Sequence, residues 1–518
     1  MWSRLALILL CAAPAFAQSD SLASLIQSGN RKAALEKIRA GADVNAAQPD
    51  GTRPVHWAVF RVDHELLQAL IAKKAKVDVA NEFGSTPIAE AAKLADATMV
   101  KMLLDAGAEP EGANADGQSA LMLAIKTGEL PVIELLLAKG ANVNVVEKFE
   151  NQTPLMWAAA APKNAAAMVK LLLAKGANVK PRAKFTDWPT QLTSEPRAQY
   201  RPTGGLTALL YAARNGCYDC VAQLLDAGAD PNLPTPEGVT PLIMTLDNEH
   251  NEIAKLLMDR GAKPGTWDWW GRTPLYIVVD RKAAAGGGRG GRGAAPAPVR
   301  TTGPTPVTGM EIIVALLAAE VDPSPQLNMH RPSRGGNSGR FGDTQLSTGA
   351  TPLLRAVQAN DTEVSRALLA KGANPNVNAM GTTPFMLAAG VAPGRGGAPG
   401  GAPNTQLLDL MLQNGADINA QVTGTKTYSM RVSRSPATNE GASALHAAAQ
   451  GGRTELVKYL LSKGANPELL DAEGRKPIDL VGFSTQGAGR AGPGAATANA
   501  ANAASAAEIR ALLQAVKK

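Results

Sequence analysis

Aromatic side chains are scarce in this chain of 518 residues. Phe, Trp and Tyr together make up 4% of it, although apolar residues as a whole reach 45%. A core with so few large rings must be packed mainly by Leu and small residues. Beyond the first residues, long apolar runs are also missing. A membrane-spanning helix needs about 20 predominantly apolar residues in succession, so we expect no transmembrane segment.

Cysteine and histidine are also rare, with three and five residues respectively. Cys217 and Cys220 form a C-x-x-C that has neither a following His for haem attachment nor a second pair for zinc. The histidines show no ligand spacing, so we expect no metal and no cofactor. If the protein leaves the cytoplasm for an oxidising compartment, a disulfide between Cys217 and Cys220 can form. The favoured interpretation is two unpaired small residues in a turn between helices.

Motifs of catalysis are absent as well. "HELLQ" at 64–68 lacks the second His of a zinc protease. "GRGGRG" at 288–293 matches a dinucleotide fingerprint by letter, but it follows no strand and lies in a low-complexity stretch. No Ser or Cys stands in a recognisable nucleophile elbow. We therefore expect no enzyme.

The chain opens with "MWSRLALILLCAAPAFAQSD". Arg4 is followed by a short apolar stretch, and Ala15-Phe16-Ala17 is a small-x-small site. This pattern is typical of a secretory signal peptide, here residues 1–17, removed by cleavage after Ala17. We expect residues 18–518 to be exported to a bacterial periplasm, with the extracellular medium as the alternative.

What the chain has in abundance is repetition. "LLLAKGANV" occurs at 135–143 and again at 171–179, with near-copies at 368–375 and 460–467. Starts such as "GSTPIAEAA" and "GVTPLIMTL" recur about every 33 residues, and aligning them gives twelve units. A fixed period of this length indicates stacked units that cannot bury an apolar face alone. The prediction is one continuous array.

Each unit carries the signals of two helices. Thr or Ser before the Pro can cap the first helix, and Pro suits its first position. Small residues follow, then a turn, then a second helix with Leu pairs that ends in Lys-Gly or Ala-Gly. Gly takes the left-handed position after a helix. In "LLAAEVDP", Glu320 stands where Gly is expected, which predicts a local irregularity.

These features resemble the ankyrin repeat family. The resemblance rests on the "G-x-TPL" starts, the "AA" and "LL" pairs, and "GA-D/N-x-N" at 41–45, 228–232 and 415–419. It implies an all-α solenoid of about twelve helix-turn-helix units with hairpin-like fingers. The His that the family favours after "TPL" survives only at His56 and His446, where it is expected to bond to neighbouring loops.

Six segments interrupt the period and are rich in Gly, Ala, Pro, Ser and Arg, the composition of unpacked chain. They are expected between the helices of a unit or at the fingers, and not inside a helix. The segments are approximately 180–201, 283–300, 329–348, 390–404, 424–440 and 484–503.

The formal net charge of +7 comes from these insertions, because the remaining framework is net acidic. A uniformly basic surface for nucleic acid is therefore not supported, and we expect no nucleic-acid partner. The Arg-bearing insertions could contact an anionic envelope surface. The favoured interpretation is that they are solvated spacers.

Two sets of aromatic residues are candidates for binding a protein partner, since Trp is enriched at binding hot spots. One set lies on fingers, which the resemblance implies project from the stack, so large apolar groups there are expected to be partly exposed. The other set lies on the inner side of the first helices, three residues after the Pro position. Packing against neighbouring fingers and units is the alternative for both sets. The candidates are Trp267, Trp269, Trp270, Phe83 and Glu82 on fingers, and Trp57, Trp157 and Tyr211 on first helices.

The hypothesis is thus a non-catalytic scaffold that binds an unidentified protein through its inner face and fingers, as a monomer. The alternative is an envelope tether in which the basic Gly/Arg insertions bind an anionic surface and the stack serves as a spacer.

Overall fold

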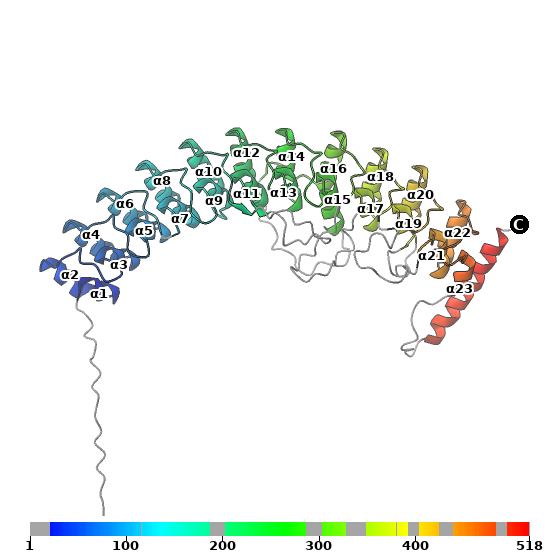
Figure 1. Cartoon of the computed structure of the whole chain (residues 1–518), viewed down its shortest axis with the longest axis horizontal. Coiled ribbons are helices and arrows are strands. Elements are labelled where there is room, and N and C mark those ends of the chain that lie inside the picture. Colours follow the sequence, from blue (N-terminus) through cyan, green and yellow to red (C-terminus); the bar gives the residue numbers. More distant parts are fainter. Residues whose placement is uncertain are drawn as a thin grey trace, which may run out of the picture. The chain divides into compact units, whose positions relative to one another are not determined.

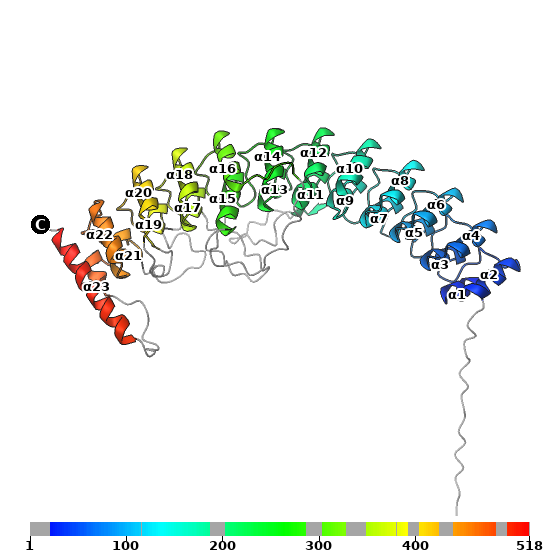
Figure 2. The same ribbon diagram turned by 180° about the vertical axis from the view of Figure 1, so that it is seen from behind.

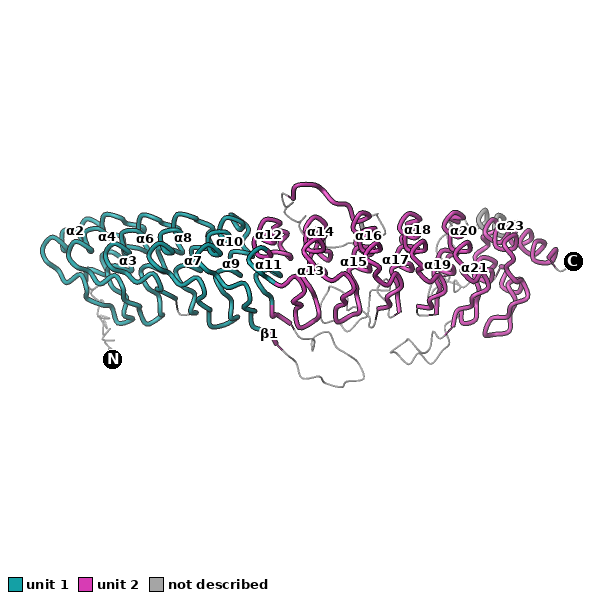
Figure 3. The backbone as a smooth tube through the Cα atoms, turned by 90° about the horizontal axis from the view of Figure 1, so that it is seen from above, with its two compact units in different colours: residues 1–184, 206–211, 226–229 teal, residues 185–205, 212–225, 230–518 magenta. Residues whose placement is uncertain are grey.

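In the computed structural model, nine parts of the chain are described. They are residues 21–114, 116–186, 203–285, 303–327, 349–379, 381–391, 403–423, 439–482 and 495–516. The expected signal peptide and most of the six insertions lie outside these residues. The chain divides into two compact units: residues 1–184, 206–211 and 226–229 form unit 1, and the others form unit 2 (Figure 3). The division passes through helices α11 (Ala208–Asn215) and α12 (Tyr218–Asp226).

Unit 1 is a stack of helix pairs. In each pair a first helix is followed by an antiparallel second helix, and the first helices form one row and the second helices another (Figure 1). The first helices are α1 (Leu22–Gln27), α3 (Pro54–Phe60), α5 (Pro87–Lys93), α7 (Ala120–Thr127) and α9 (Pro154–Ala160). The second helices are α2 (Arg31–Arg39), α4 (His64–Ala72), α6 (Ala97–Asp105), α8 (Leu130–Ala138) and α10 (Ala165–Ala174).

Unit 2 repeats this arrangement, with its first helices in one row and its second helices in another (Figure 2). Its first helices are α13 (Pro241–Asp247), α15 (Pro274–Ala285), α17 (Pro352–Gln358), α19 (Pro384–Ala388), α21 (Ala444–Gln450) and the 3₁₀ turn η2 (Pro477–Leu480). Its second helices are α14 (Asn251–Asp259), α16 (Gly309–Ala318), α18 (Thr362–Ala370), α20 (Thr405–Gln413), α22 (Thr454–Ser462) and α23 (Ala495–Ala515). Strands β1 (Phe185–Thr186) and β2 (Thr203–Gly204) form a short antiparallel pair.

The twelve units predicted from the sequence correspond to twelve helix pairs among the described residues, so the all-α solenoid is confirmed. The predicted caps are also found. Thr153 and Thr240 each accept a hydrogen bond from the third helical amide, at 3.4 and 3.2 Å, with Pro as the first helical residue. Every side chain of α7 from Ala120 to Ile125 is buried, because this helix packs against α8 and against the first helices on either side.

Two predicted insertion boundaries are wrong. Helix α15 continues through 283–285, and α23 already begins at Ala495, within the segment predicted as unpacked up to 503. The reason in both cases is alanine, the best helix former, which extends a helix until glycine stops it. Residues 286–302, 392–402 and 483–494 lie outside the described residues, and each of these stretches stands in the sequence between the two helices of a pair.

The irregularity predicted at Glu320 does not lie in its backbone angle. Glu320 adopts φ +56°, the left-handed conformation that Gly takes at the same position of other units. Lys74 occupies that position in an earlier unit with φ +62°.

Candidate partner-binding fingers and inner face

The fingers at Asn81 and Asp268 are tight loops, each organised by one polar side chain. Asp268 accepts hydrogen bonds from the backbone N–H groups of Trp270 and Arg272, at 3.1 and 2.9 Å. Asn81 does the same for Phe83 and Ser85, at 3.1 and 3.0 Å. These bonds pair amides that a short loop would otherwise leave without a partner. The fingers are therefore ordered before any partner arrives.

Successive fingers are joined by single backbone hydrogen bonds. In unit 1 the Glu82 N–H donates to the Asp50 carbonyl at 2.9 Å. In unit 2 the Trp269 N–H donates to the Glu237 carbonyl at 2.8 Å. Glu82 and Trp269 hold the same position in their fingers, so each backbone is fixed while its side chain stays on the surface.

The finger at 265–272 presents two of its three tryptophans to solvent. Trp267 is 65% exposed and Trp269 is 40% exposed, so the predicted projection of aromatic groups from this finger is found for both. Trp270 is only 8% exposed, so its expected partial exposure is wrong. Its ring lies against the guanidinium of Arg272, whose central carbon is 5.5 Å from the ring centroid.

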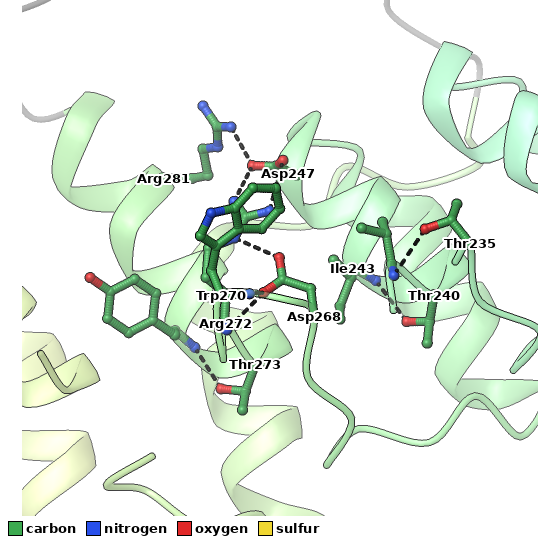
Figure 4. Close-up of polar contacts among 11 residues, drawn as sticks. Thr235, Thr240, Ile243, Asp247, Asp268, Trp270, Arg272, Thr273 and Arg281 are labelled. Carbon is green, nitrogen blue, oxygen red and sulfur yellow. Dashed lines mark hydrogen bonds and ion pairs between the residues drawn. The ribbon is translucent and has the colours of Figure 1, made fainter. Parts of the chain in front are cut away.

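A buried ion cluster holds the base of this finger (Figure 4). Arg272 Nε donates to Asp268 at 2.7 Å, and its two terminal nitrogens reach Asp247 of α13 at 3.2 and 3.4 Å. Arg281 of α15 also pairs with Asp247. Burial by itself lowers the pKa of Arg272, but the carboxylates of Asp247 and Asp268 outweigh it and raise that pKa. The cluster therefore remains charged and ties the finger to two first helices.

Phe83 and Glu82 lie on an earlier finger, in unit 1, and both are exposed. Phe149 on another finger of that unit is exposed as well, and it was not among the predicted residues. Its two-residue offset from the capping Glu147, whose carboxylate accepts the Phe149 N–H at 2.8 Å, matches the offset of Phe83 from Asn81. The offset alone does not predict exposure, because Trp270 has the same offset from Asp268 and is buried.

The inner-face aromatics of unit 1 are half-buried. Trp57 on α3 donates its indole N–H to Gln48 at 2.7 Å and meets Phe60 edge-on, with ring centroids 5.7 Å apart. Tyr211 on α11 accepts a hydrogen bond from the Gln152 side chain at 2.8 Å. These rings thus combine packing between units with a partly accessible face.

Trp157 and Tyr211 line one cavity of about 240 Å³ in unit 1. It lies along the first helices α7, α9 and α11. Its walls are Lys126, Gln152, Met156, Trp157, Ala160, Ala161, Pro162 and Tyr211.

Some of the residues in the same helical position as Trp57 and Trp157 are not accessible. Leu123, Ile277 and Arg355 are buried. Arg355 forms an ion pair with Asp280 of α15, which helps to close the inner face of unit 2 at this point.

Sequence reasoning missed a polar bridge between consecutive units. The Asn that ends "GA-D/N-x-N" donates its side-chain N–H to a carbonyl of the next unit and accepts an amide there. Asn232 donates to the Gly261 carbonyl at 3.0 Å and accepts from the Lys263 N–H at 2.7 Å. Asn144 bridges to Gly176 and Asn178 in the same way, at 3.2 and 2.8 Å. The recurrence of this Asn was the available signal.

Cys217 and Cys220 are joined by a disulfide at the start of α12. The favoured interpretation of two unpaired cysteines is therefore wrong, and the disulfide that the sequence left open is present. The first turn of α12 brings the two residues together, and the Cys220 N–H donates to Cys217 Sγ at 3.2 Å.

Within the described ranges, no group of His, Cys, Asp or Glu residues could hold a metal ion. A search of the same part of the chain finds no helix with the length and hydropathy needed to cross a membrane.

Stacked helix pairs with capped fingers define a solenoid of the helical repeat class. Family models for ankyrin repeats match residues 21–114, 96–183 and 209–284 as groups of three copies, and 348–379 and 440–472 as single repeats. These matches cover more than half of the chain, which therefore belongs to the ankyrin repeat family. Ankyrin repeats are protein-interaction modules, and proteins built from them are generally non-enzymatic scaffolds.

Two individual proteins are similar to parts of the chain. Alpha-latrocrustotoxin-Lt1a of Latrodectus tredecimguttatus is 30% identical over 140 residues, which are 27% of this chain and only 8% of the toxin. The crystal structure of the human ASB11 ankyrin repeat domain is 24% identical, with a TM-score of 0.36. It covers 47% of this chain and 98% of its own.

Proposed function

We propose that this protein is a non-catalytic scaffold that binds a protein partner chiefly through Trp267 and Trp269 of the finger at 265–272. The observation that carries the proposal is the contrast within this finger. Two indoles are exposed at 65% and 40%, while the residues beneath them, Asp268 and Arg272, are buried in an ion cluster. Large apolar rings on a fixed base are typical of binding hot spots.

The fixed base matters for affinity. The Trp269 backbone is bonded to the preceding finger, and Asp268 already caps the loop. Little conformational freedom is then lost when a partner binds, so more of the apolar contact energy appears as affinity. Burying one such indole contributes on the order of 2 kcal/mol at a hot spot.

The test is the double variant Trp267→Ala with Trp269→Ala, used as bait in affinity capture from the cells that produce the protein. We expect the partner recovered with the wild-type protein to bind the double variant at least about 30-fold more weakly, since about 2 kcal/mol corresponds to that factor. Trp270 is left in place because its ring is buried and its loss would disturb the finger.

The matched control is Val314→Ala, which removes an exposed apolar side chain from α16, away from the fingers. We expect this variant to bind as the wild type does. Unchanged affinity in the double Trp variant, with its helical signal intact, would refute the assignment of this finger.

We further propose that the scaffold acts in the bacterial envelope, as a monomer in the periplasm. The support is the pattern at residues 1–17 of a basic residue, an apolar stretch and a small-x-small site. Fusing these residues to a reporter enzyme that is active only after export would test the localisation. The extracellular medium remains the alternative destination.

The second candidate is the envelope tether. Basic residues exceed acidic ones in all six insertions, while the framework is net acidic. This charge separation favours contact of the insertions with an anionic surface.

A further inference from the structure

The cavity in unit 1 owes its existence to the way α9 ends. Pro162 follows α9 closely, and a residue before proline is pushed out of the helical region. Ala161 accordingly has φ −68° and ψ 140°, an extended conformation. The small side chains of Ala160 and Ala161 then leave space beside the ring of Trp157. Many other first helices end instead with a residue in helical conformation.

The walls of this cavity are apolar over most of their extent. Met156, Pro162 and the rings of Trp157 and Tyr211 supply most of the apolar surface. The Gln152 side chain spans to the Tyr211 hydroxyl at 2.8 Å and so fixes the two polar walls relative to each other. The cavity is therefore shaped before a ligand enters.

Two groups of its wall, the Lys126 ammonium and the Trp157 indole N–H, are hydrogen-bond donors with no acceptor function. Among the described residues of the wall, Lys126 is the only charged one and none is acidic. The indole N–H of Trp157 is buried and finds no acceptor within the described part of the chain. A buried donor without an acceptor costs about 1–3 kcal/mol. The Lys126 ammonium would attract an anionic group bound in the cavity, whose apolar part would then lie against the Trp157 ring.

We propose that this cavity binds the C-terminal residue of a partner polypeptide, with its carboxylate at Lys126 and its apolar side chain against Trp157, Tyr211 and Met156. Drug-sized ligands occupy pockets of roughly 300–1,000 Å³. A cavity of about 240 Å³ is smaller and suits a single residue. The site belongs to unit 1 and does not depend on the finger at 265–272, so either proposal can fail alone.

The experiment titrates the full chain with N-acetyl-L-phenylalanine and follows the indole N–H signal of Trp157 by NMR. Trp157→Phe identifies that signal, because it removes the N–H and keeps a ring. Two further probes test the carboxylate. N-acetyl-L-phenylalanine amide lacks it, and N-acetyl-L-glutamate amide carries it on a side chain instead of at the chain terminus.

We expect N-acetyl-L-phenylalanine to shift the Trp157 signal and to bind at least about tenfold more tightly than its amide, the factor expected for losing one charge-assisted contact. Lys126→Met should abolish that difference between acid and amide. The matched control Lys170→Met removes an exposed lysine on α10 of the same unit and should leave it unchanged.

Three results would overturn the proposal. One is equal binding of the acid and the amide. Another is an unmoved Trp157 signal at saturating ligand. The third is tighter binding of the glutamate derivative, which would assign the cavity to an internal acidic side chain instead of a chain terminus.

Discussion

At the scale of single residues, the turn after each second helix depends on one residue with positive φ. Gly372 adopts +84° there, and a side chain at this position would meet nothing within 4 Å. Lys74 and Glu320 adopt the same conformation with a Cβ atom, at +62° and +56°. This conformation costs about 1–2 kcal/mol for residues other than Gly, so the sequence departs from its own rule at two places.

We therefore predict that Glu320→Gly and Lys74→Gly each raise the free energy of unfolding by about 0.5–1 kcal/mol, the backbone gain less the greater entropy loss of Gly on folding. Gly372→Ala is the matched reverse change and should lower it by about 1 kcal/mol, because only the backbone conformation is affected. Urea unfolding followed by circular dichroism measures all three. A stabilising Gly372→Ala would contradict the account.

Two buried histidines, in their neutral form, link consecutive repeats by hydrogen bonds. His446 Nδ1 accepts from the Ser443 N–H at 3.2 Å, so Nε2 carries the proton and donates to the Arg475 carbonyl at 3.1 Å. His56 does the same between Arg53 and Val79, at 3.1 and 2.9 Å. Burial lowers the pKa of both, although His446 also faces Asp471, which raises its pKa.

The pH dependence follows from these lowered values. Below a pH of about 6.5 the unfolded chain binds protons that the folded histidines refuse. Their stabilising contribution is thus complete above that pH and is lost as the pH falls toward the lower folded pKa. We predict a smaller free energy of unfolding at pH 5.5 than at pH 7.5, and a reduced difference in the double variant His56→Gln with His446→Gln. An equal difference in both proteins would contradict this role.

At the scale of elements, the bridging Asn couples neighbouring helix pairs. Asn232→Asp keeps the acceptor for Lys263 but loses the N–H that reaches the Gly261 carbonyl. We predict that it lowers the free energy of unfolding by about 1 kcal/mol, and Asn232→Ala by more, since a net hydrogen bond contributes about 0.5–1.5 kcal/mol. The Lys263 amide should exchange its hydrogen faster in Asn232→Ala but not in Asn232→Asp, because only the Ala variant loses the acceptor. Unchanged exchange in Asn232→Ala would contradict this role of the Asn232 side chain.

Helix starts could be predicted from the sequence because the Thr-Pro pair is a local signal that caps its own helix. Helix limits inside alanine-rich stretches, where no Thr-Pro pair stands, were less certain. The composition of 283–285 and 495–503 indicated unpacked chain, yet its alanines extend α15 and α23. Composition does not distinguish a spacer from an alanine-rich helix when no cap residue intervenes.

Part of the candidate site could be predicted because it depends on local sequence. Trp267, Trp269 and Phe83 lie on fingers whose turns are local. The burial of Trp270 depends on Arg272, which is oriented by Asp247 from another helix. A contact that arises only when helix pairs stack leaves no mark on the neighbouring sequence. The cavity beside Trp157 was missed because it needs Tyr211, more than 50 residues further along the chain.

At the scale of the whole molecule, the scaffold and tether proposals differ in the role that they give to the basic insertions. Deleting 286–302 and 392–402 removes basic insertions without cutting α15 or α20. We predict that the deletion leaves partner capture unchanged. Co-sedimentation with vesicles containing anionic phosphatidylglycerol tests the alternative. Salt-sensitive binding by the full chain that disappears on deletion, together with lost capture, would favour the tether.

The most direct measurement for the central claim is hydrogen exchange of the protein alone and in complex with its captured partner. The account predicts that amides of the finger at 265–272 and of the preceding finger around Glu237 become strongly protected in the complex, while those of α16 do not change. Protection confined to the basic insertions, with none at this finger, would contradict it.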